Sequence, residues 1–124
     1  MHSDPLPVYH RDIREPNIMK NIHGRGWFLI DWSDACIAPT RAVTHLKESE
    51  HSPRVREDGH GAEVDIWSVG KYLESLASRV TCGIANPDEV VKMARKWMAD
   101  HTVSAAAALK EIKVCIDHLP VIMK

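Results

Sequence analysis

The sequence predicts an α+β fold in which helix predominates, and three observations support this class. Two short apolar runs, at residues 18–19 and 27–30, are separated by a polar stretch with two glycines, which predicts a β-hairpin with a loop longer than two residues. Residues 33–60 show no period and are rich in proline, serine, histidine and charged residues, which indicates one long loop. Beyond this loop, apolar residues recur at helical spacing. The predicted order is therefore hairpin, long loop and helices.

The helical part divides into a central helix, predicted over residues 63–77, and C-terminal helices, predicted over residues 87–118. In the central helix, apolar residues recur every three or four positions, as one buried face requires; they are Ile66, Val69, Leu73 and Leu76. Asn86, followed by a proline and two acidic residues, is a typical N-cap for the next helix. Ser104 is placed to cap the last helix.

Composition and charge exclude several classes of partner. The chain has 124 residues, of which 44% are apolar and 27% charged, as expected of one globular domain. The formal net charge is −1, so neither a nucleic acid nor an anionic membrane is an expected partner. No signal peptide or transmembrane segment is recognisable, and the three widely spaced cysteines fit free thiols. An intracellular protein, cytoplasmic or nuclear, is expected.

Residues 10–17, His-Arg-Asp-Ile-Arg-Glu-Pro-Asn, match the H-R-D-x-x-x-x-N pattern of the catalytic loop of eukaryotic protein kinases. Such a loop aims one carboxylate at the substrate hydroxyl and an amide oxygen at a metal ion beside the phosphates. The resemblance implies that Asp12 is the catalytic base and Asn17 a ligand of Mg²⁺. It also implies that Arg14, where most serine/threonine kinases have lysine, is a cation near the transferred phosphate.

A second motif, Asp31-Trp32-Ser33, follows the second apolar run, where the kinase family usually has D-F-G. The resemblance implies that Asp31 binds Mg²⁺ and that it contacts ATP together with Arg14 and Asn17. Trp32 supplies an aromatic side chain for packing, whereas Ser33 lacks the backbone freedom of glycine. The sequence I-D-W also resembles small-molecule phosphotransferases related to aminoglycoside and choline kinases. These variations are similar to those of divergent kinase-like proteins that are abundant in fungi.

Residues 63–70 resemble the D-x-W-S-x-G opening of the central helix of protein kinases. The resemblance implies a structural anchor in which Asp65 accepts hydrogen bonds from the backbone near His10 and holds the catalytic loop rigid. Arg54 stands where the family's A-P-E motif has its glutamate, and the arginine that pairs with that glutamate is also missing. Because both members of that ion pair are replaced, no buried charge is left without its partner.

The resemblance covers most of the chain and implies that residues 1–124 form a partial protein-kinase-like domain, the mostly helical C-terminal lobe. Its expected parts are the catalytic loop (10–17), the metal-binding loop (31–33), an activation-segment-like loop (33–60), the central helix (63–77) and the C-terminal helices (87–118). The sequence shows no Gly-rich loop, no strand-borne lysine and no helix ahead of His10.

The expected function is phosphoryl transfer from ATP, with Mg²⁺, to serine or threonine of a protein substrate, weak or absent without an N-terminal lobe. Two alternatives remain open: a non-catalytic, pseudokinase-type interaction module, and a fragment of a small-molecule phosphotransferase. The apolar face of the central helix is expected to be exposed and to bind a partner chain or a second copy.

The loop of residues 33–60 is expected to be the least ordered part of the chain, because few apolar contacts are expected to hold it. Within the resemblance, Arg11 waits near this loop for a phosphate. The histidines show no metal-ligand spacing. Six of them are expected at the solvated surface: His23, His45, His51, His60, His101 and His118.

Overall fold

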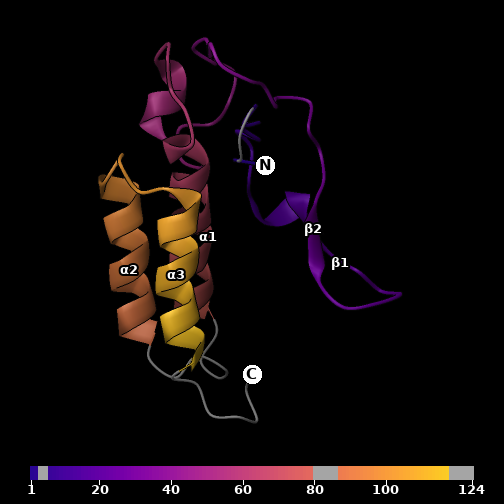
Figure 1. Cartoon of the computed structure of the whole chain (residues 1–124), viewed down its shortest axis with the longest axis vertical. Coiled ribbons are helices and arrows are strands. Elements are labelled where there is room, and N and C mark those ends of the chain that lie inside the picture. Colours follow the sequence, from indigo (N-terminus) through magenta and orange to yellow (C-terminus); the bar gives the residue numbers. More distant parts are fainter. Residues whose placement is uncertain (3–5, 80–86, 118–124) are drawn as a thin grey trace.

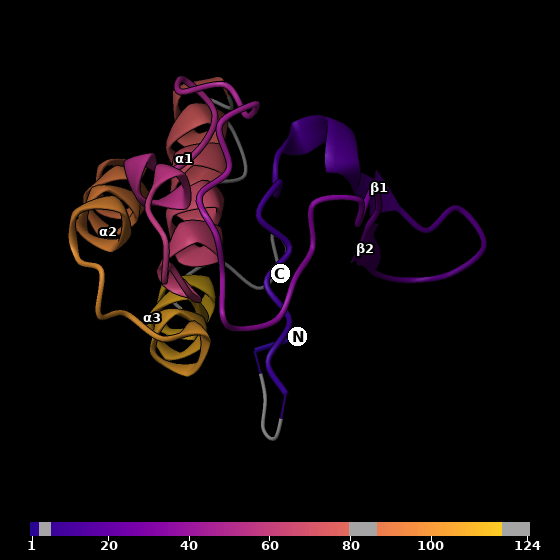
Figure 2. The ribbon, with the colours of Figure 1, turned by 90° about the horizontal axis from the view of Figure 1, so that it is seen from above.

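The computed structural model describes residues 1–2, 6–79 and 87–117 of the chain. Within these residues the chain forms three α-helices, two short 3₁₀ helices and one antiparallel two-stranded sheet, which confirms the predicted α+β class. The helices α1, α2 and α3 lie side by side, and the hairpin lies apart from them (Figure 1). The view from above shows the same separation (Figure 2).

The predicted hairpin is present. Strand β1, Ile18–Lys20, pairs with strand β2, Trp27–Leu29, in a register that places Met19 opposite Phe28. The loop between the strands contains Gly26 with a φ of 102°, a left-handed conformation that favours glycine. The polar stretch between the two apolar runs therefore forms the connection that its composition predicted.

The three helices occupy the segments in which helical spacing was found. They are α1, Glu63–Arg79, α2, Pro87–Ala99, and α3, Ala105–Asp117. The Oγ atom of Ser104 accepts a hydrogen bond at 3.1 Å from a backbone N–H in the first turn of α3, which confirms the predicted cap. The predicted cap at Asn86 lies outside the described residues.

The apolar face of α1 is covered by α2 and α3. The cluster between these helices is contributed by all three of them and the segment before α3: Ile66, Met93, Trp97 and Ala108 are buried, and Val69, Leu73, Val103 and Ile112 pack against them. The expectation that this face is exposed was therefore wrong. The physical reason is that α2 and α3 fold back along α1 and supply the apolar cover themselves.

Helices α1 and α2 approach each other closely at Gly70. A Cβ atom at this position would lie 2.8 Å from the carbonyl oxygen of Ala94, closer than real Cβ contacts, and 3.1 Å from Cγ of Met98. Ala94 is itself fully buried. The glycine of the D-x-W-S-x-G motif therefore allows the backbone of α2 to reach α1.

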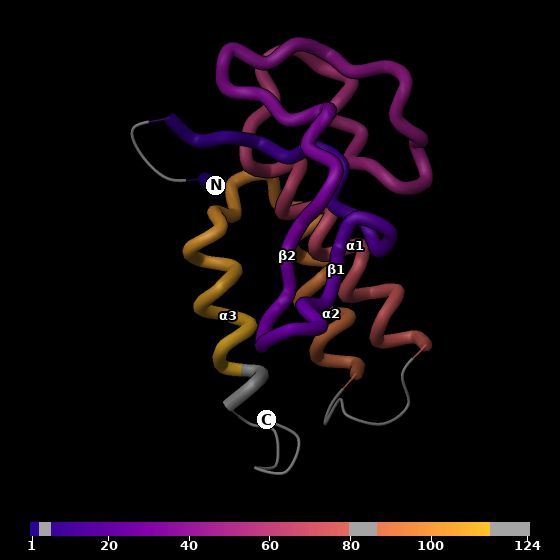
Figure 3. The backbone as a smooth tube through the Cα atoms, turned by 90° about the vertical axis from the view of Figure 1, so that its right-hand side faces the viewer, coloured from indigo at the N-terminus to yellow at the C-terminus, as the bar shows by residue number. Residues whose placement is uncertain are grey.

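Residues 33–60 wrap over the N-terminal end of α1, as Figures 1 and 3 both show. This loop shares a second buried apolar cluster with α1, formed by Val43, Leu46, Val55 and Val64. The backbone N–H of Val43 donates to the carbonyl of Val55 at 2.8 Å, and the short 3₁₀ helix η2, Pro53–Arg56, adds local structure. The expectation that few apolar contacts hold the loop was wrong, because scattered aliphatic residues converge on one point without forming a period.

Several large apolar side chains are exposed on and near the hairpin: Met19, Ile22, Trp27, Phe28 and Trp32. Ile22, in the hairpin loop, is 84% exposed. Exposed apolar side chains in the described part of the chain thus include several on and near the hairpin. None of the helices in the described part of the chain has both the length and the apolar character needed to cross a lipid bilayer.

Candidate functional site

The carboxylate of Asp65 fixes the backbone of the loop at residues 10–17. Asp65 lies in the first turn of α1 and is 1% exposed. Its Oδ2 accepts a hydrogen bond from the N–H of His10 at 2.9 Å, and its Oδ1 accepts one from the N–H of Arg11 at 2.8 Å. The Nε2 atom of His2 lies 2.7 Å from Oδ2 as well. The predicted hydrogen bonds of Asp65 to the loop are confirmed.

The anchored loop contains a strained residue. Arg11 has a φ of 68°, in the left-handed region that residues with a Cβ rarely adopt. A conformation of this kind costs about 1–3 kcal/mol and persists only where the surroundings enforce it. The hydrogen bond from Arg11 to Asp65 is one such constraint. Strain held in this way is common at functional sites.

His10 connects the loop to the end of the hairpin. Its ring is fully buried, and its Nδ1 accepts a hydrogen bond at 3.1 Å from the backbone N–H of Asp12. Since Nδ1 accepts, Nε2 carries the proton and donates to the carbonyl of Ile30 at 3.0 Å. The ring of Trp32 packs edge-on against His10, with 4.6 Å between centroids. Trp32 therefore supplies the expected aromatic packing.

Three side-chain donors surround the carboxylate of Asp12, which is buried. Its Oδ1 accepts from Nε of Arg14 at 3.0 Å and lies 2.7 Å from Nε2 of His51. Its Oδ2 accepts from Nδ2 of Asn17 at 3.1 Å, and the same amide donates to the carbonyl of Asp12 at 2.9 Å. The structure therefore brings Asp12, Arg14 and Asn17 together, and adds His51.

Asn17 is placed by a short 3₁₀ helix and by the hairpin. The helix η1, Glu15–Asn17, has proline at its start, and the N–H of Asn17 donates to the carbonyl of Arg14 at 2.9 Å. The carbonyl of Asn17 accepts from the N–H of Ile30 at 2.9 Å. The hairpin therefore places Asn17 beside the residue that precedes Asp31.

Asp31 is exposed and has a φ of 56°, the second strained residue of this region. Its Oδ1 accepts from the hydroxyl of Ser33 at 2.6 Å and from the N–H of Ser33 at 3.4 Å. These bonds, with smaller contributions from His10 and Arg14, lower the pKa of Asp31. The left-handed residue is thus Asp31 itself, and Ser33 acts as a hydrogen-bond donor to it. None of the hydrogen bonds described for Asp31 joins it to Asn17.

The described residues offer a limited set of metal ligands. Among them, no group of three or more His, Cys, Asp or Glu side chains is placed to hold a metal ion. The Asn17 amide nitrogen is directed at Asp12, so the amide oxygen is the atom of Asn17 that would bind a metal ion, and the carboxylate of Asp31 is exposed and has a lowered pKa. Two oxygen ligands fit Mg²⁺ when phosphates and water complete the coordination.

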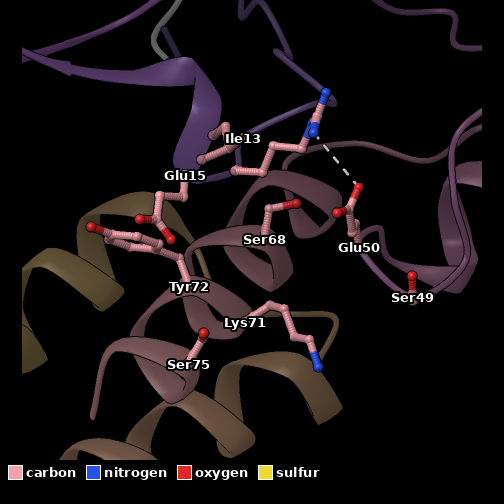
Figure 4. Close-up of a pocket in the computed structure, with 9 residues that line it drawn as sticks. Ile13, Glu15, Ser49, Glu50, Ser68, Lys71, Tyr72 and Ser75 are labelled. Carbon is pink, nitrogen blue, oxygen red and sulfur yellow. Dashed lines mark ion pairs between the residues drawn. The ribbon is translucent and has the colours of Figure 1, made fainter. Parts of the chain in front are cut away.

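A cavity of about 160 Å³ lies beside Arg14, between the loop at residues 10–17, residues 49–50 and helix α1. In Figure 4, Ser68, Tyr72 and Ser75 extend from α1 toward it. The guanidinium of Arg14 forms an ion pair with Glu50 across this space, at 3.7 Å. Arg14 thus links the Asp12 carboxylate to this cavity.

The side chain of Arg11 is already bound. Its Nε donates to the carbonyl of Asp34 at 2.6 Å, and its Nη1 lies 3.4 Å from the carbonyl of Arg41 and from Nε2 of His60. His60 in turn donates from Nδ1 to the carbonyl of Glu57 at 2.7 Å. Backbone carbonyls of the loop therefore bind the guanidinium of Arg11 in the unphosphorylated chain, and the binding of a phosphate by Arg11 stays a prediction.

Arg54 forms an ion pair with Glu63, whereas the ion pair of the kinase A-P-E motif is missing from the sequence. Its Nε donates to Glu63 at 3.1 Å, and the N–H of Gly61 donates to the same carboxylate at 2.9 Å. Partial burial raises the pKa of Glu63, but the hydrogen bonds from Gly61 and Arg54 outweigh it, so that the net shift is downward. Arg54 is positively charged where the kinase motif has a negative glutamate, and the carboxylate of Glu63 neutralises this charge.

Two histidines that were expected at the surface are buried in this region, namely His51 and His60. Both come from the loop of residues 33–60, and neither has a sequence neighbour that indicates its partner. His51 is 39 positions from Asp12 in the chain. The spacing of the sequence carries no signal for such a contact, and only the fold of the loop creates it.

The chain was compared with family models, with solved structures and with curated proteins. No family model matches the chain, and no solved structure matches it. Over 102 residues, 79% of this chain, the sequence is 33% identical to Crinkler effector protein 8 of Phytophthora infestans. The matched part is 17% of that relative, so this chain corresponds to a small portion of its length.

Proposed function

We propose that this chain is part of the C-terminal lobe of a protein-kinase-like phosphotransferase, which transfers phosphate from ATP to serine or threonine of a protein. One observation carries the proposal. The side chains of Asp12, Arg14 and Asn17 contact one another within one loop, and the buried carboxylate of Asp65 in α1 holds the backbone of that loop. The H-R-D-x-x-x-x-N spacing alone does not require either contact.

In the proposed reaction, Asp12 orients the substrate hydroxyl and accepts its proton. The hydroxyl oxygen forms a bond to the terminal phosphorus of ATP while the bond to the leaving ADP oxygen breaks. Arg14, whose guanidinium is bound to Asp12 and which borders the cavity beside α1, stabilises the charge on the transferred phosphate. The anchored loop maintains these positions, so little reorganisation is needed.

Asn17 and Asp31 are the proposed ligands of Mg²⁺, which would neutralise charge on the phosphates of ATP. The low pKa of Asp31 keeps its carboxylate ionised at neutral pH, as a metal ligand must be. Because two protein oxygens bind Mg²⁺ weakly without phosphates, we expect the isolated chain to bind Mg-ATP weakly and to transfer phosphate at no appreciable rate.

A titration of the chain with Mg-ATP, alone and with candidate partner chains, tests the proposal. We expect weak binding that is lost in Asp31→Asn and kept in Asp100→Asn, an exposed aspartate remote from the loop in sequence and hydrogen-bonded to Thr102. Where a partner restores transfer, Asp12→Asn should abolish it without abolishing binding. Binding that is indifferent to Asp31 would refute the assigned metal site.

A non-catalytic interaction module is the second candidate, and two observations favour it. The Asp12 carboxylate is buried beneath three donors, which leaves a substrate little access to it. Large apolar side chains are also exposed on the hairpin, including Trp27 and Phe28, and such surfaces commonly bind other proteins. The relative from Phytophthora infestans is named an effector, a word that does not indicate phosphoryl transfer.

The hairpin offers a direct test of this candidate. In sedimentation experiments, we expect association of the chain with itself or with a partner, weakened by replacement of Trp27 and Phe28 with threonine. Replacement of the exposed Leu109 and Val114 on α3 is the matched control. Association that responds equally to both pairs would argue against an interface at the hairpin.

A further inference from the structure

The hydrogen bonds of three buried histidines determine where their ring protons lie. A neutral imidazole has one N–H donor and one acceptor nitrogen, whereas the imidazolium has two donors. In His10, Nδ1 accepts from a backbone N–H and Nε2 donates to a carbonyl, so this ring is neutral. In His60, Nδ1 donates to a carbonyl and Nε2 faces the guanidinium of Arg11, so this ring is neutral as well.

His51 differs from both, because each of its ring nitrogens faces an oxygen that only accepts. Nδ1 lies 2.8 Å from the carbonyl oxygen of Lys47, and Nε2 lies 2.7 Å from Oδ1 of Asp12. A neutral ring would direct a lone pair at one of these oxygens, in a place where the two side chains are only 5% and 7% exposed. Such a buried repulsion is costly, and protonation of both nitrogens removes it.

We infer that His51 is an imidazolium and a positioning residue for Asp12. Oδ1 of Asp12 binds two cations, His51 and Arg14, and is thereby fixed. Oδ2 accepts one described hydrogen bond, from Asn17, and a carboxylate oxygen has about two acceptor sites. Oδ2 is therefore the oxygen that takes the proton of the substrate hydroxyl, and Oδ1 holds the carboxylate in its orientation.

The contact also links the base to the activation-segment-like loop. His51 belongs to that loop, and its other nitrogen is held by the carbonyl of Lys47, four positions earlier in the same loop. A change in the loop that moves His51 therefore changes the donors on Asp12 directly. The role of Asp12 as a base rests on the proposed function, whereas the charged His51–Asp12 pair rests on the geometry alone.

Long-range ¹H–¹⁵N spectra of the histidine-labelled chain at neutral pH test the charge. We expect the doubly protonated pattern for His51, the neutral pattern with the proton on Nδ1 for His60, and the neutral pattern with the proton on Nε2 for His10. In Asp12→Asn, His51 should shift toward the neutral pattern, while His60 and His10, as internal controls, keep theirs. A neutral His51 in the unmodified chain, or one unaffected by Asp12→Asn, would overturn the inference.

A second measurement separates positioning from mere packing. The ¹³C carboxyl resonance of Asp12 should shift in His51→Leu, which fills space without a donor. It should return toward its original position in His51→Gln, whose amide can donate to Oδ1. Equal spectra for the two variants would also overturn the inference. Neither measurement uses ATP or Mg²⁺, so failure of the Mg-ATP titration leaves this result intact, and the reverse is also true.

Discussion

Replacement of Asp65 is the most direct perturbation of the proposed site. Its carboxylate is almost completely buried, and it accepts hydrogen bonds from the backbone of His10 and Arg11. Asp65→Ala removes both acceptor oxygens and leaves the two backbone N–H groups, and also the ring nitrogen of His2, without this partner. Asp65→Asn keeps one acceptor oxygen but directs an N–H₂ group at the other donor. The two variants therefore remove different fractions of the same arrangement.

The expected magnitude follows from the number of stranded donors. A buried donor without a partner costs about 1–3 kcal/mol, so that two of them cost about 2–6 kcal/mol. The unfavourable desolvation of the carboxylate disappears in the variant and offsets part of this loss. We therefore expect Asp65→Ala to lower the free energy of unfolding by about 3 kcal/mol, and Asp65→Asn by about half of that. Both are large fractions of the typical total of about 5–15 kcal/mol.

Urea unfolding followed by tryptophan fluorescence measures this loss, since Trp97 is buried between the helices. Asp100→Ala is the control, because Asp100 is exposed and bonds only locally to Thr102 in the described structure. Its midpoint should remain near that of the unmodified chain. If Asp65→Ala unfolds at the same urea concentration as the control, the carboxylate does not hold the loop and the assignment of α1 as its anchor is wrong.

Three further predictions concern other parts of the structure. Ser33→Ala should raise the pKa of Asp31 toward its ordinary value in an NMR titration, because it removes the hydroxyl donor that contributes most to the lowered value. Gly70→Ala should destabilise the chain by about 1 kcal/mol in urea, since overpacking costs about 1–3 kcal/mol and the gain in helix propensity returns about 1 kcal/mol. Because the pKa of Glu63 is lowered by folding, Glu63 stabilises the native state at pH values above its ordinary pKa of 4.5, and this contribution is lost as the pH falls through the folded value. Arg54→Met should therefore lose less stability on acidification than the unmodified chain does. The same dependence of the free energy of unfolding on pH in both chains would contradict this.

Much of the fold could be predicted because its elements have strong local signals. The hairpin follows from two apolar runs around glycines, and the three helices follow from their period and from the cap at Ser104. The hydrogen bonds of Asp65 to the loop at residues 10–17 follow from the resemblance, since a motif encodes the partners of its members along with their spacing. The sequence pattern alone would not have paired Asp65 with residues more than 50 positions away.

The remaining features depend on contacts between distant segments, which leave no period in the sequence. Val43 and Val55 lie in a segment of mostly polar residues, yet they meet Val64 of α1 in a buried cluster. His51 is surrounded by polar residues and reads as a surface histidine until the loop brings it to Asp12. The packing of α2 and α3 on the apolar face of α1 was also not predicted. An amphipathic pattern shows that a helix has an apolar face, but it does not show which other helix that face packs against.

The first turn of α1 joins these parts into one unit. It carries two acidic residues, Glu63 and Asp65, at the end of a helix where the macrodipole favours negative charge. Glu63 binds Arg54 of the long loop, and Asp65 binds the backbone of the loop that contains Asp12. His51 of the long loop in turn contacts Asp12, so α1, the long loop and the loop at residues 10–17 are each linked to the other two. We therefore expect substitutions of Asp65, Arg54 and His51 to have non-additive effects on the free energy of unfolding in double-mutant cycles. Gly70 takes no part in these contacts, and its substitution should be additive with them.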